Sequence, residues 1–161
     1  GKINCNDSQR IQRALEVYYI SEIPLSTFYM NQIKPEVPYK ILKIALFPSK
    51  REQLHNVIEE RVGAMLKNGL VEEVRSILTM YPTLDESYPS LRAVGYRQAC
   101  HYLKNKISKG ELKDKIIFAT RQLAKRQITW MRKMENLEIF EPYSHDLNLK
   151  VKSRVEEFLL N

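Results

Sequence analysis

The sequence predicts a mainly α protein with one or two strands, and three observations support this fold class. Apolar residues recur with helical periodicity along most of the 161 residues. Segment 41–47, ILKIALF, is the best strand in the chain, since it is apolar and partly β-branched. An apolar strand must pair, and this chain offers only LEIF, 137–140, which would not make a stable sheet with it. We therefore expect other strands to come from a preceding part of the protein, so that this chain is the second half of an α/β protein.

The first elements are two helices. Asp7 is a suitable N-cap for a helix over 8–21, whose stripe of Ile11, Ala14, Leu15 and Tyr18 is apolar. Pro24 ends that pattern and starts a short second helix over 24–32. The segment KPEVPYK, 34–40, is a proline-marked link to the strand at 41–47.

The remaining elements follow from caps and periodicity. Ser49 and Glu52 predict a capping box for a helix that ends near Asn68-Gly69. A helix over 90–104 is expected despite Gly95, which costs about 1 kcal/mol against alanine in a helix. The other expected elements are a helix over 71–80, a loop over 81–90, a long helix over 111–134, the LEIF strand and a closing helix over 148–160.

Composition favours an anionic partner. Lys and Arg number 26 against 19 Asp and Glu, which gives a formal net charge of +7. No apolar run is long enough for a membrane span and no secretion signal is present. Two distant cysteines and three scattered histidines match no metal or redox spacing, so we expect a reduced, cytoplasmic protein. The chain lacks an initiator Met, which predicts a piece of a longer protein, with a processed or tagged full-length chain as an even alternative.

A basic stripe lies on the long helix. At about 100° per residue, Arg121, Lys125 and Arg132 share one side. The opposite side is an apolar arc expected to be packed, with Arg126 and Gln127 at its flanks: Leu112, Ile116, Ala119, Leu123, Trp130 and Met134. A solvated basic face is the simpler interpretation. However, no acidic residue between Lys115 and Lys133 relieves the charge, which makes an anionic partner more attractive.

Arg61 stands out on the helix before it. It falls at the centre of the apolar arc formed by Leu54, Val57, Ile58, Val62 and Met65, where an aliphatic residue is expected. A buried guanidinium needs a partner, and its planar fork suits phosphate. An arginine that snorkels at the edge of the core is an equal alternative.

Two further groups of polar residues are candidates for nucleic-acid contact. Gln9, Arg13 and Glu16 share a polar side of the first helix, which is more simply a solvent-exposed side. In SLRAVGYRQ, Arg92 and Arg97 flank a glycine and a tyrosine. That glycine fits a close approach of backbone or ligand, or a helix break.

The chain contains no recognisable catalytic motif. The sequence contains no GxxxxGK[ST] phosphate loop, and its five glycines are isolated. No Ser/His/Asp or Cys/His arrangement is credible. If the protein is an enzyme, part of its site lies outside these residues.

Four segments in order resemble the C-terminal half of the tRNA dimethylallyltransferases, also called tRNA isopentenyltransferases. They are NDSQRIQRALEVYYISEIPLS, RVGAMLKNGLVEEV, AVGYRQ and ATRQLAKRQITWMR, which lie between Asn6 and Arg132. The resemblance implies a P-loop kinase-like core with an inserted helical domain, whose end would be residues 1–36, while 37–161 would complete the core. It implies transfer of a dimethylallyl group from dimethylallyl diphosphate, with Mg²⁺, to N6 of the adenosine 3′ of the anticodon.

The resemblance also assigns site residues. Arg61 matches a family arginine that contacts the diphosphate. Three segments match regions that contact the anticodon stem-loop of tRNA: Gln9, Arg10, Ile11, Gln12 and Arg13; Arg92, Ala93, Val94, Gly95, Tyr96 and Arg97; and Lys125, Arg126, Gln127, Ile128, Thr129, Trp130, Met131 and Arg132.

Departures from the family qualify this assignment. The phosphate loop and the aspartate that serves as general base have no counterpart, and neither has the zinc finger of eukaryotic members. We therefore expect half of a bacterial-type enzyme, monomeric when whole, with most magnesium ligands elsewhere and no activity in this chain alone. The alternatives are a non-catalytic helical RNA-binding module and an adaptor for an acidic protein.

Overall fold

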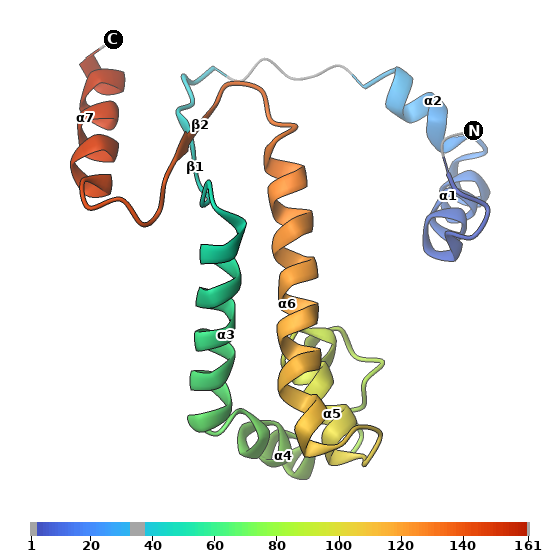
Figure 1. Cartoon of the computed structure of the whole chain (residues 1–161). Helices are drawn as coiled ribbons and strands as arrows, with labels where there is room; N and C mark the ends of the chain where they lie inside the picture. The colour runs from blue at the N-terminus through green and yellow to red at the C-terminus, as the bar shows by residue number, and fades with distance from the viewer. Residues whose placement is uncertain (1–2, 33–37, 161) are drawn as a thin grey trace. The chain divides into compact units, whose positions relative to one another are not determined.

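A computed structural model describes residues 3–32 and 38–160 (Figure 1). It separates into two compact units, residues 1–41 and 42–161, which are described one at a time. The expected domain boundary between residues 36 and 37 falls outside the described residues. The assignment of the first part to an inserted helical domain therefore stays a prediction.

The first unit holds two helices, α1 (Ser8–Ser21) and α2 (Leu25–Met30). The Asp7 carboxylate accepts a hydrogen bond from the backbone N–H of Arg10 at 3.1 Å, which confirms the predicted N-cap. The expected apolar stripe of α1 is only partly covered within this unit, because Leu15 and Tyr18 are 47% and 48% exposed.

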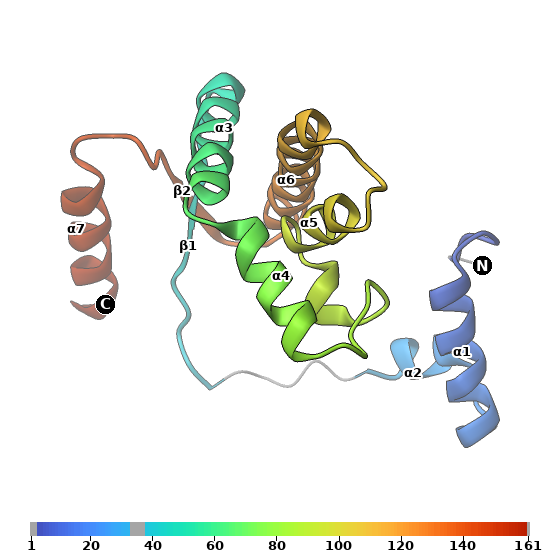
Figure 2. The ribbon, with the colours of Figure 1, turned by 90° about the horizontal axis from the view of Figure 1, so that it is seen from below.

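The second unit is built on two antiparallel helices, α3 (Arg51–Lys67) and α6 (Lys109–Met131). They lie side by side in both ribbon views (Figures 1 and 2). The helices α4 (Leu70–Met80) and α5 (Tyr96–Leu103), with the 3-10 turn Pro89–Arg92, lie at the end of this pair away from the strands. Of the helices in the described residues, none is long and apolar enough to cross a membrane.

Two parallel strands, β1 (Lys43–Leu46) and β2 (Leu137–Phe140), confirm both predicted strand segments. They pair with each other in the register Lys43 to Leu137, although neither was expected to find a sufficient partner within this chain. The helix α7 (Leu147–Leu160) follows β2, and Arg154 donates two hydrogen bonds of 2.7 Å to the carboxylate of Glu138 on that strand.

Apolar side chains between α3, α4, α5 and α6 form the core. One cluster joins α3 to α6, and a second lies under the 81–92 segment and α5. The strands contribute one buried residue, Ala45, whereas Leu46 and Ile139 are about half exposed. The buried residues of the two clusters are Ile58, Val62, Leu70, Ile107, Leu112, Ile116 and Ile117 in the first, and Val74, Leu91, Ala99 and Cys100 in the second.

The start of α3 differs from prediction. Lys50 is the N-cap residue and no side chain caps the helix, so the expected Ser49–Glu52 capping box is wrong. The backbone N–H of Ser49 instead donates to the Glu141 carboxylate at 2.7 Å. That contact ties the chain after β1 to the chain after β2, and it holds the pKa of Glu141 below its usual value. A side-chain cap can form only if the local backbone is free to adopt its geometry.

The segment 90–104 is not one helix. The 3-10 turn ends at Arg92, and Gly95 has φ +97°, which side chains with a Cβ rarely adopt. The helix α5 starts only after it. A Cβ on Gly95 would lie 3.4 Å from Cε of the Met65 side chain, an ordinary contact. The helix break is therefore confirmed, whereas a close approach of backbone or ligand stays a prediction.

The long helix is confirmed, but it begins earlier than expected. Ser108 and Glu111 form a reciprocal capping box, in which the backbone N–H of Ser108 donates to Glu111 at 2.8 Å. This contact lowers the pKa of Glu111. The helix is therefore Lys109–Met131 rather than 111–134.

Candidate nucleic-acid interface

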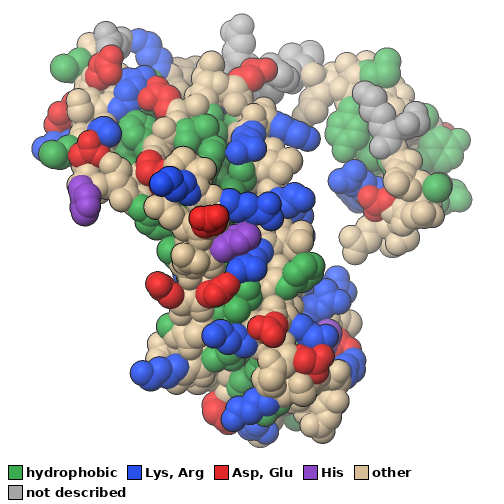
Figure 3. Space-filling view, viewed as in Figure 1, with side chains coloured by type: hydrophobic (Ala, Val, Ile, Leu, Met, Phe, Trp, Pro, Cys, Tyr) green, Lys and Arg blue, Asp and Glu red, His purple; other side chains and the backbone are tan. Residues whose placement is uncertain are grey.

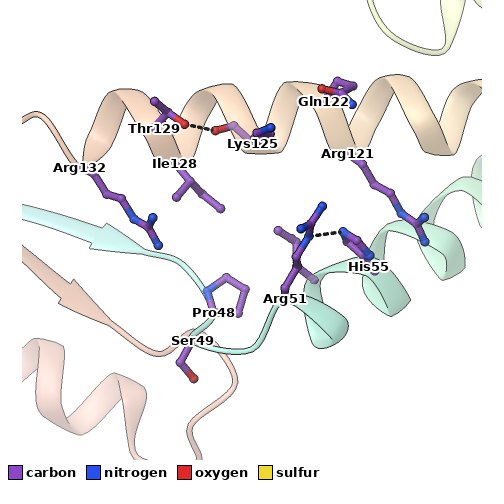
Figure 4. A pocket seen from close by; sticks show the side chains of 11 residues that line it. Pro48, Ser49, Arg51, His55, Arg121, Gln122, Lys125, Ile128, Thr129 and Arg132 are labelled. Atoms are coloured by element: carbon purple, nitrogen blue, oxygen red, sulfur yellow. Dashed lines mark hydrogen bonds between the residues drawn. The ribbon is translucent and has the colours of Figure 1, made fainter.

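A basic groove of about 310 Å³ lies where the first turns of α3 face the C-terminal half of α6 (Figure 4). The connection from β1 to α3 closes one end of it. We call it the α3–α6 groove, and its lining residues are Pro48, Ser49, Arg51, Leu54, His55, Arg121, Gln122, Lys125, Ile128, Thr129 and Arg132.

Helix geometry explains why these side chains meet. Arg51 and His55 are four residues apart and therefore lie on one side of α3. Arg121, Lys125 and Arg132 are separated by four and seven residues, which keeps them on one side of α6. Because the two helices are antiparallel neighbours, both sides line the same groove (Figure 4).

Most of the charge in the groove is not neutralised. No carboxylate among the described residues forms an ion pair with Arg51, Lys125 or Arg132. Arg121 is the exception, since its Nη2 pairs with Glu59 on α3. Figure 3 shows Lys and Arg side chains gathered beside a histidine over this part of α3 and α6.

His55 reports the local electrostatics. It accepts a hydrogen bond from Nε of Arg51 at 3.3 Å. Partial burial and the positive charges of Arg121 and Arg51 lower its pKa, while Glu59 opposes that shift. A histidine nitrogen that accepts a hydrogen bond carries no proton, so this contact and the lowered pKa both favour the neutral imidazole.

Two arginines that line the groove have N–H groups without a hydrogen-bond partner among the described residues. The guanidinium carbon of Arg132 lies 6.0 Å from the centroid of the Phe47 ring, a cation–π contact that leaves its N–H groups free. Nε of Arg121 is buried and has no hydrogen-bond partner. A groove lined by planar guanidinium forks and an ammonium suits phosphate oxygens.

The side of α6 that packs against α3 differs from the expected one. Trp130 is 65% exposed and Leu123 is 38% exposed, so the expected packed arc is wrong in this half of the helix. Ala124, Ile128 and Arg121 are half-buried instead. The small side chain of Ala124 and the Arg121–Glu59 pair allow α6 to approach α3 on that side.

Arg61 is exposed, which contradicts the expectation of a buried guanidinium. The buried side of α3 is centred on Ile58 and Val62, and Val57 next to Arg61 is also 40% exposed. Arg61 does not line the α3–α6 groove. Its assignment to the diphosphate stays a prediction that rests on the resemblance alone.

The three expected tRNA-contact segments lie in different places. Residues 9–13 are in the first unit, exposed except for half-buried Ile11, and Arg10 and Arg13 form ion pairs of 3.3 Å with acidic residues of that unit. Residues 92–97 lie at the far end of the second unit, where the Tyr96 hydroxyl donates to Glu73. These two segments contribute nothing to the groove.

Of the three expected tRNA-contact segments, only 125–132 contributes to the groove, and only some of its residues line it. Lys125, Ile128, Thr129 and Arg132 line it, whereas Arg126, Gln127, Trp130 and Met131 do not.

Sequence reasoning missed Arg51 and His55 altogether and placed Arg121 outside the contact segment. A basic pair at i and i+4 near the start of α3 was the available signal. It could not be connected to α6 before the packing of the two helices was known.

Residues 3–32 and 38–160 hold no group of three His, Cys, Asp or Glu side chains that could bind a metal ion. Cys5 and Cys100 are both free thiols.

Comparison with known proteins identifies related sequences and structures. A family model described as IPP transferase matches residues 1–134. A protein from Nitrosomonas europaea named tRNA dimethylallyltransferase is 48% identical over 141 residues, which are 88% of this chain and 44% of that protein. One of the same name from Legionella pneumophila is 40% identical and covers 100% of this chain and 51% of its own length.

Two solved structures agree with these matches. A tRNA isopentenylpyrophosphate transferase from Staphylococcus epidermidis superposes with a TM-score of 0.66 at 28% identity, over 97% of this chain and 51% of that one. The full-length enzyme from Bacillus halodurans gives a TM-score of 0.66 at 26% identity, over 98% and 46%. The chain thus spans about half the length of the relatives it matches.

Proposed function

Because the chain belongs to the IPP transferase family, we propose that its protein transfers a dimethylallyl group from dimethylallyl diphosphate to N6 of the adenosine 3′ of the anticodon in tRNA. The observation that carries this proposal is the match, at 40 to 48% identity, to proteins named tRNA dimethylallyltransferase. The α3–α6 groove supports the proposal, since it is a basic surface that includes part of the segment that the resemblance assigns to tRNA contact.

In this reaction N6 of the adenosine forms a bond to the allylic carbon, and the bond from that carbon to the diphosphate oxygen breaks. A base takes the proton from N6, and no residue of this chain is proposed for that step. Arg61 would lower the barrier by neutralising charge on the leaving diphosphate. Its exposed guanidinium forms no ion pair within the described residues and is therefore available to a ligand.

The chain supplies only part of such an enzyme. It spans about half the length of the relatives, and β1 and β2 form a two-stranded parallel sheet whose outer edges have no partner strand in the described residues, where further strands could add. We propose a P-loop kinase-like core whose phosphate loop, magnesium ligands and general base lie elsewhere in the protein. Monomeric state and cytoplasmic location also stay predictions.

The test is a transfer assay on the protein as its gene encodes it. Unmodified tRNA, dimethylallyl diphosphate and Mg²⁺ are incubated with the protein, and nucleosides from the digested tRNA are analysed by mass spectrometry. We expect dimethylallyladenosine at the position 3′ of the anticodon. RNA binding with no transfer would instead support a non-catalytic RNA-binding module.

The 161-residue chain is assayed in parallel. It has no phosphate loop in its sequence, so we expect no transfer from it. Transfer by a preparation free of the longer protein would contradict this division of the enzyme.

A further inference from the structure

We propose that the α3–α6 groove binds phosphodiester groups of the RNA backbone, with Arg51 and Arg121 as direct contacts in addition to Lys125 and Arg132. This inference rests on the proposed function and extends it. Arg51, His55 and Arg121 lie outside all three segments that the resemblance assigns to tRNA. They would make α3 part of the RNA-binding surface.

Charge is the first argument. Four cationic side chains converge on one cavity of about 310 Å³, and only Arg121 among them has a carboxylate partner within the described residues. Cations held this close repel one another, and a bound anion relieves that repulsion. The phosphate backbone supplies an anion to which arginine forks bind with parallel hydrogen bonds.

Hydrogen-bonding capacity is the second argument. Arg51 donates from Nε to Nε2 of His55, and within the described residues its Nη groups have no carboxylate or carbonyl partner. Arg132 is exposed, and its contact with the Phe47 ring leaves its N–H groups available as well. Phosphate oxygens in the groove would accept hydrogen bonds from both guanidinium groups.

The groove is separate from the expected diphosphate contact. Arg61 is ten residues after Arg51 on α3, which places their Cα atoms about 15 Å apart along the helix axis. The two positions also differ by about 80° around the axis. The diphosphate that Arg61 is proposed to contact is therefore a different ligand from the one in the groove.

Continuity favours RNA as the occupant. Lys125, Ile128, Thr129 and Arg132 belong both to the groove and to the segment proposed to contact the anticodon arm. A backbone that crosses this segment reaches Arg51 and Arg121 without leaving the cavity. Phosphate oxygens could also come from a free diphosphate, so the experiment separates these two sources.

The first experiment measures affinity for a synthetic anticodon stem-loop RNA at several salt concentrations. Arg51→Gln removes a cation that has no carboxylate partner, so the fold is not expected to suffer. We expect affinity to fall about tenfold and the slope of log affinity against log salt to decrease by about 0.7–0.9. Arg121→Gln should also lower the RNA affinity and the salt slope. The melting temperature of this variant is measured as well, because Glu59 loses its ion-pair partner.

Arg75→Gln is the matched control. Arg75 is an exposed arginine on α4 that pairs with Glu72 at 3.1 Å, and it lies outside the groove. We expect its affinity and salt slope to equal those of the parent. If Arg51→Gln behaves like Arg75→Gln, the groove does not bind the RNA backbone and the inference is overturned.

The second experiment uses His55 as a reporter. The charged groups that face it are Arg51 and Glu59 from α3, and Arg121 and Lys125 from α6. A phosphate in the groove favours the protonated imidazole, so NMR titration should give a higher pKa for His55 with the stem-loop RNA than without it. The RNA should also bind more tightly as pH falls through that range.

Inorganic diphosphate is the competing probe. If diphosphate at millimolar concentration raises the pKa of His55 and the RNA does not, the groove takes a free diphosphate and the inference is overturned. If neither ligand changes the pKa of His55, the groove is not an anion site and the inference is overturned.

The two proposals can fail separately. If the parent protein transfers dimethylallyl groups while Arg51→Gln binds RNA normally, only this inference fails. If the parent neither binds nor modifies tRNA, the proposed function fails.

Discussion

Arg121 on α6 and Glu59 on α3 form an ion pair that joins the two long helices of the second unit. The pair lies beside His55 at the edge of the α3–α6 groove and supplies the negative charge that acts on that imidazole. It therefore connects the packing of α6 to the electrostatics of the candidate RNA-binding surface.

Replacement of Glu59 tests that connection. Glu59→Gln removes the charge that raises the pKa of His55, so we expect this pKa to fall further below its usual value. The groove becomes more positive, and RNA affinity should rise. The loss of stability should stay below about 1 kcal/mol because the pair is partly exposed to solvent. NMR titration, RNA binding and thermal melts measure the three effects.

Glu60→Gln is the matched control, since Glu60 is an exposed neighbour with no ion pair among the described residues. An identical response from both variants would mean that net charge alone, rather than the Arg121–Glu59 pair, controls the groove.

Charge removal on α6 tests the proposed tRNA surface directly. Lys125→Ala and Arg132→Ala should weaken tRNA binding and reduce the salt slope by about 0.7–0.9 for each lost phosphate contact. Both side chains are exposed, so stability should change by no more than about 0.5 kcal/mol. Early melting with unchanged affinity and salt slope would identify the basic stripe as structural.

Trp130 separates stacking on RNA from packing. It was expected in the packed arc, where Trp130→Ala would cost about 3–5 kcal/mol of stability. Since it is 65% exposed, we expect a much smaller loss in melting experiments, and a loss of about 1–3 kcal/mol in RNA binding if a base stacks on the indole. A large stability loss with normal RNA binding would mean that another part of the protein covers it.

Arg61→Ala should impair use of dimethylallyl diphosphate more than binding of tRNA. A charge-assisted contact to the diphosphate contributes on the order of 1.5–3 kcal/mol. Steady-state kinetics with varied donor, together with RNA titration, measures the difference. Unchanged KM and kcat for the donor would refute the assignment. Because Arg61 is exposed, the variant should melt like the parent.

Gly95→Ala tests the break before α5. The added methyl meets Met65 at an ordinary distance of 3.4 Å, so the cost comes from the backbone, whose φ of +97° disfavours alanine by about 1–3 kcal/mol. Gly63→Ala is the control, since Gly63 lies within α3 and a Cβ there meets nothing within 4 Å. We expect that variant to be more stable by about 0.5–1 kcal/mol. Equal melting temperatures for the two variants would contradict this account.

The sequence alone determined most features that depend on near neighbours in the chain, although the Ser49–Glu52 capping box was predicted wrongly. Asp7 caps α1 because its carboxylate is three residues from the N–H that it accepts. Gly69 ends α3 because its φ of +95° suits glycine. The apolar periodicity that predicted the helices is also local, and so are the four segments that indicated the family. Both strand segments were recognisable from their apolar and β-branched residues.

Only the tertiary structure decided which side of each helix is buried and which distant residues share a cavity. Leu123, Trp130 and Ala124 are all compatible with a packed side of α6, and the contact with α3 selected Ala124. The same contact exposed Arg61 and brought Arg51 and His55 opposite Arg121 and Lys125. A helical pattern fixes angles around one axis, whereas burial depends on the partner helix, whose distance and rotation are set by side chains far apart in the sequence.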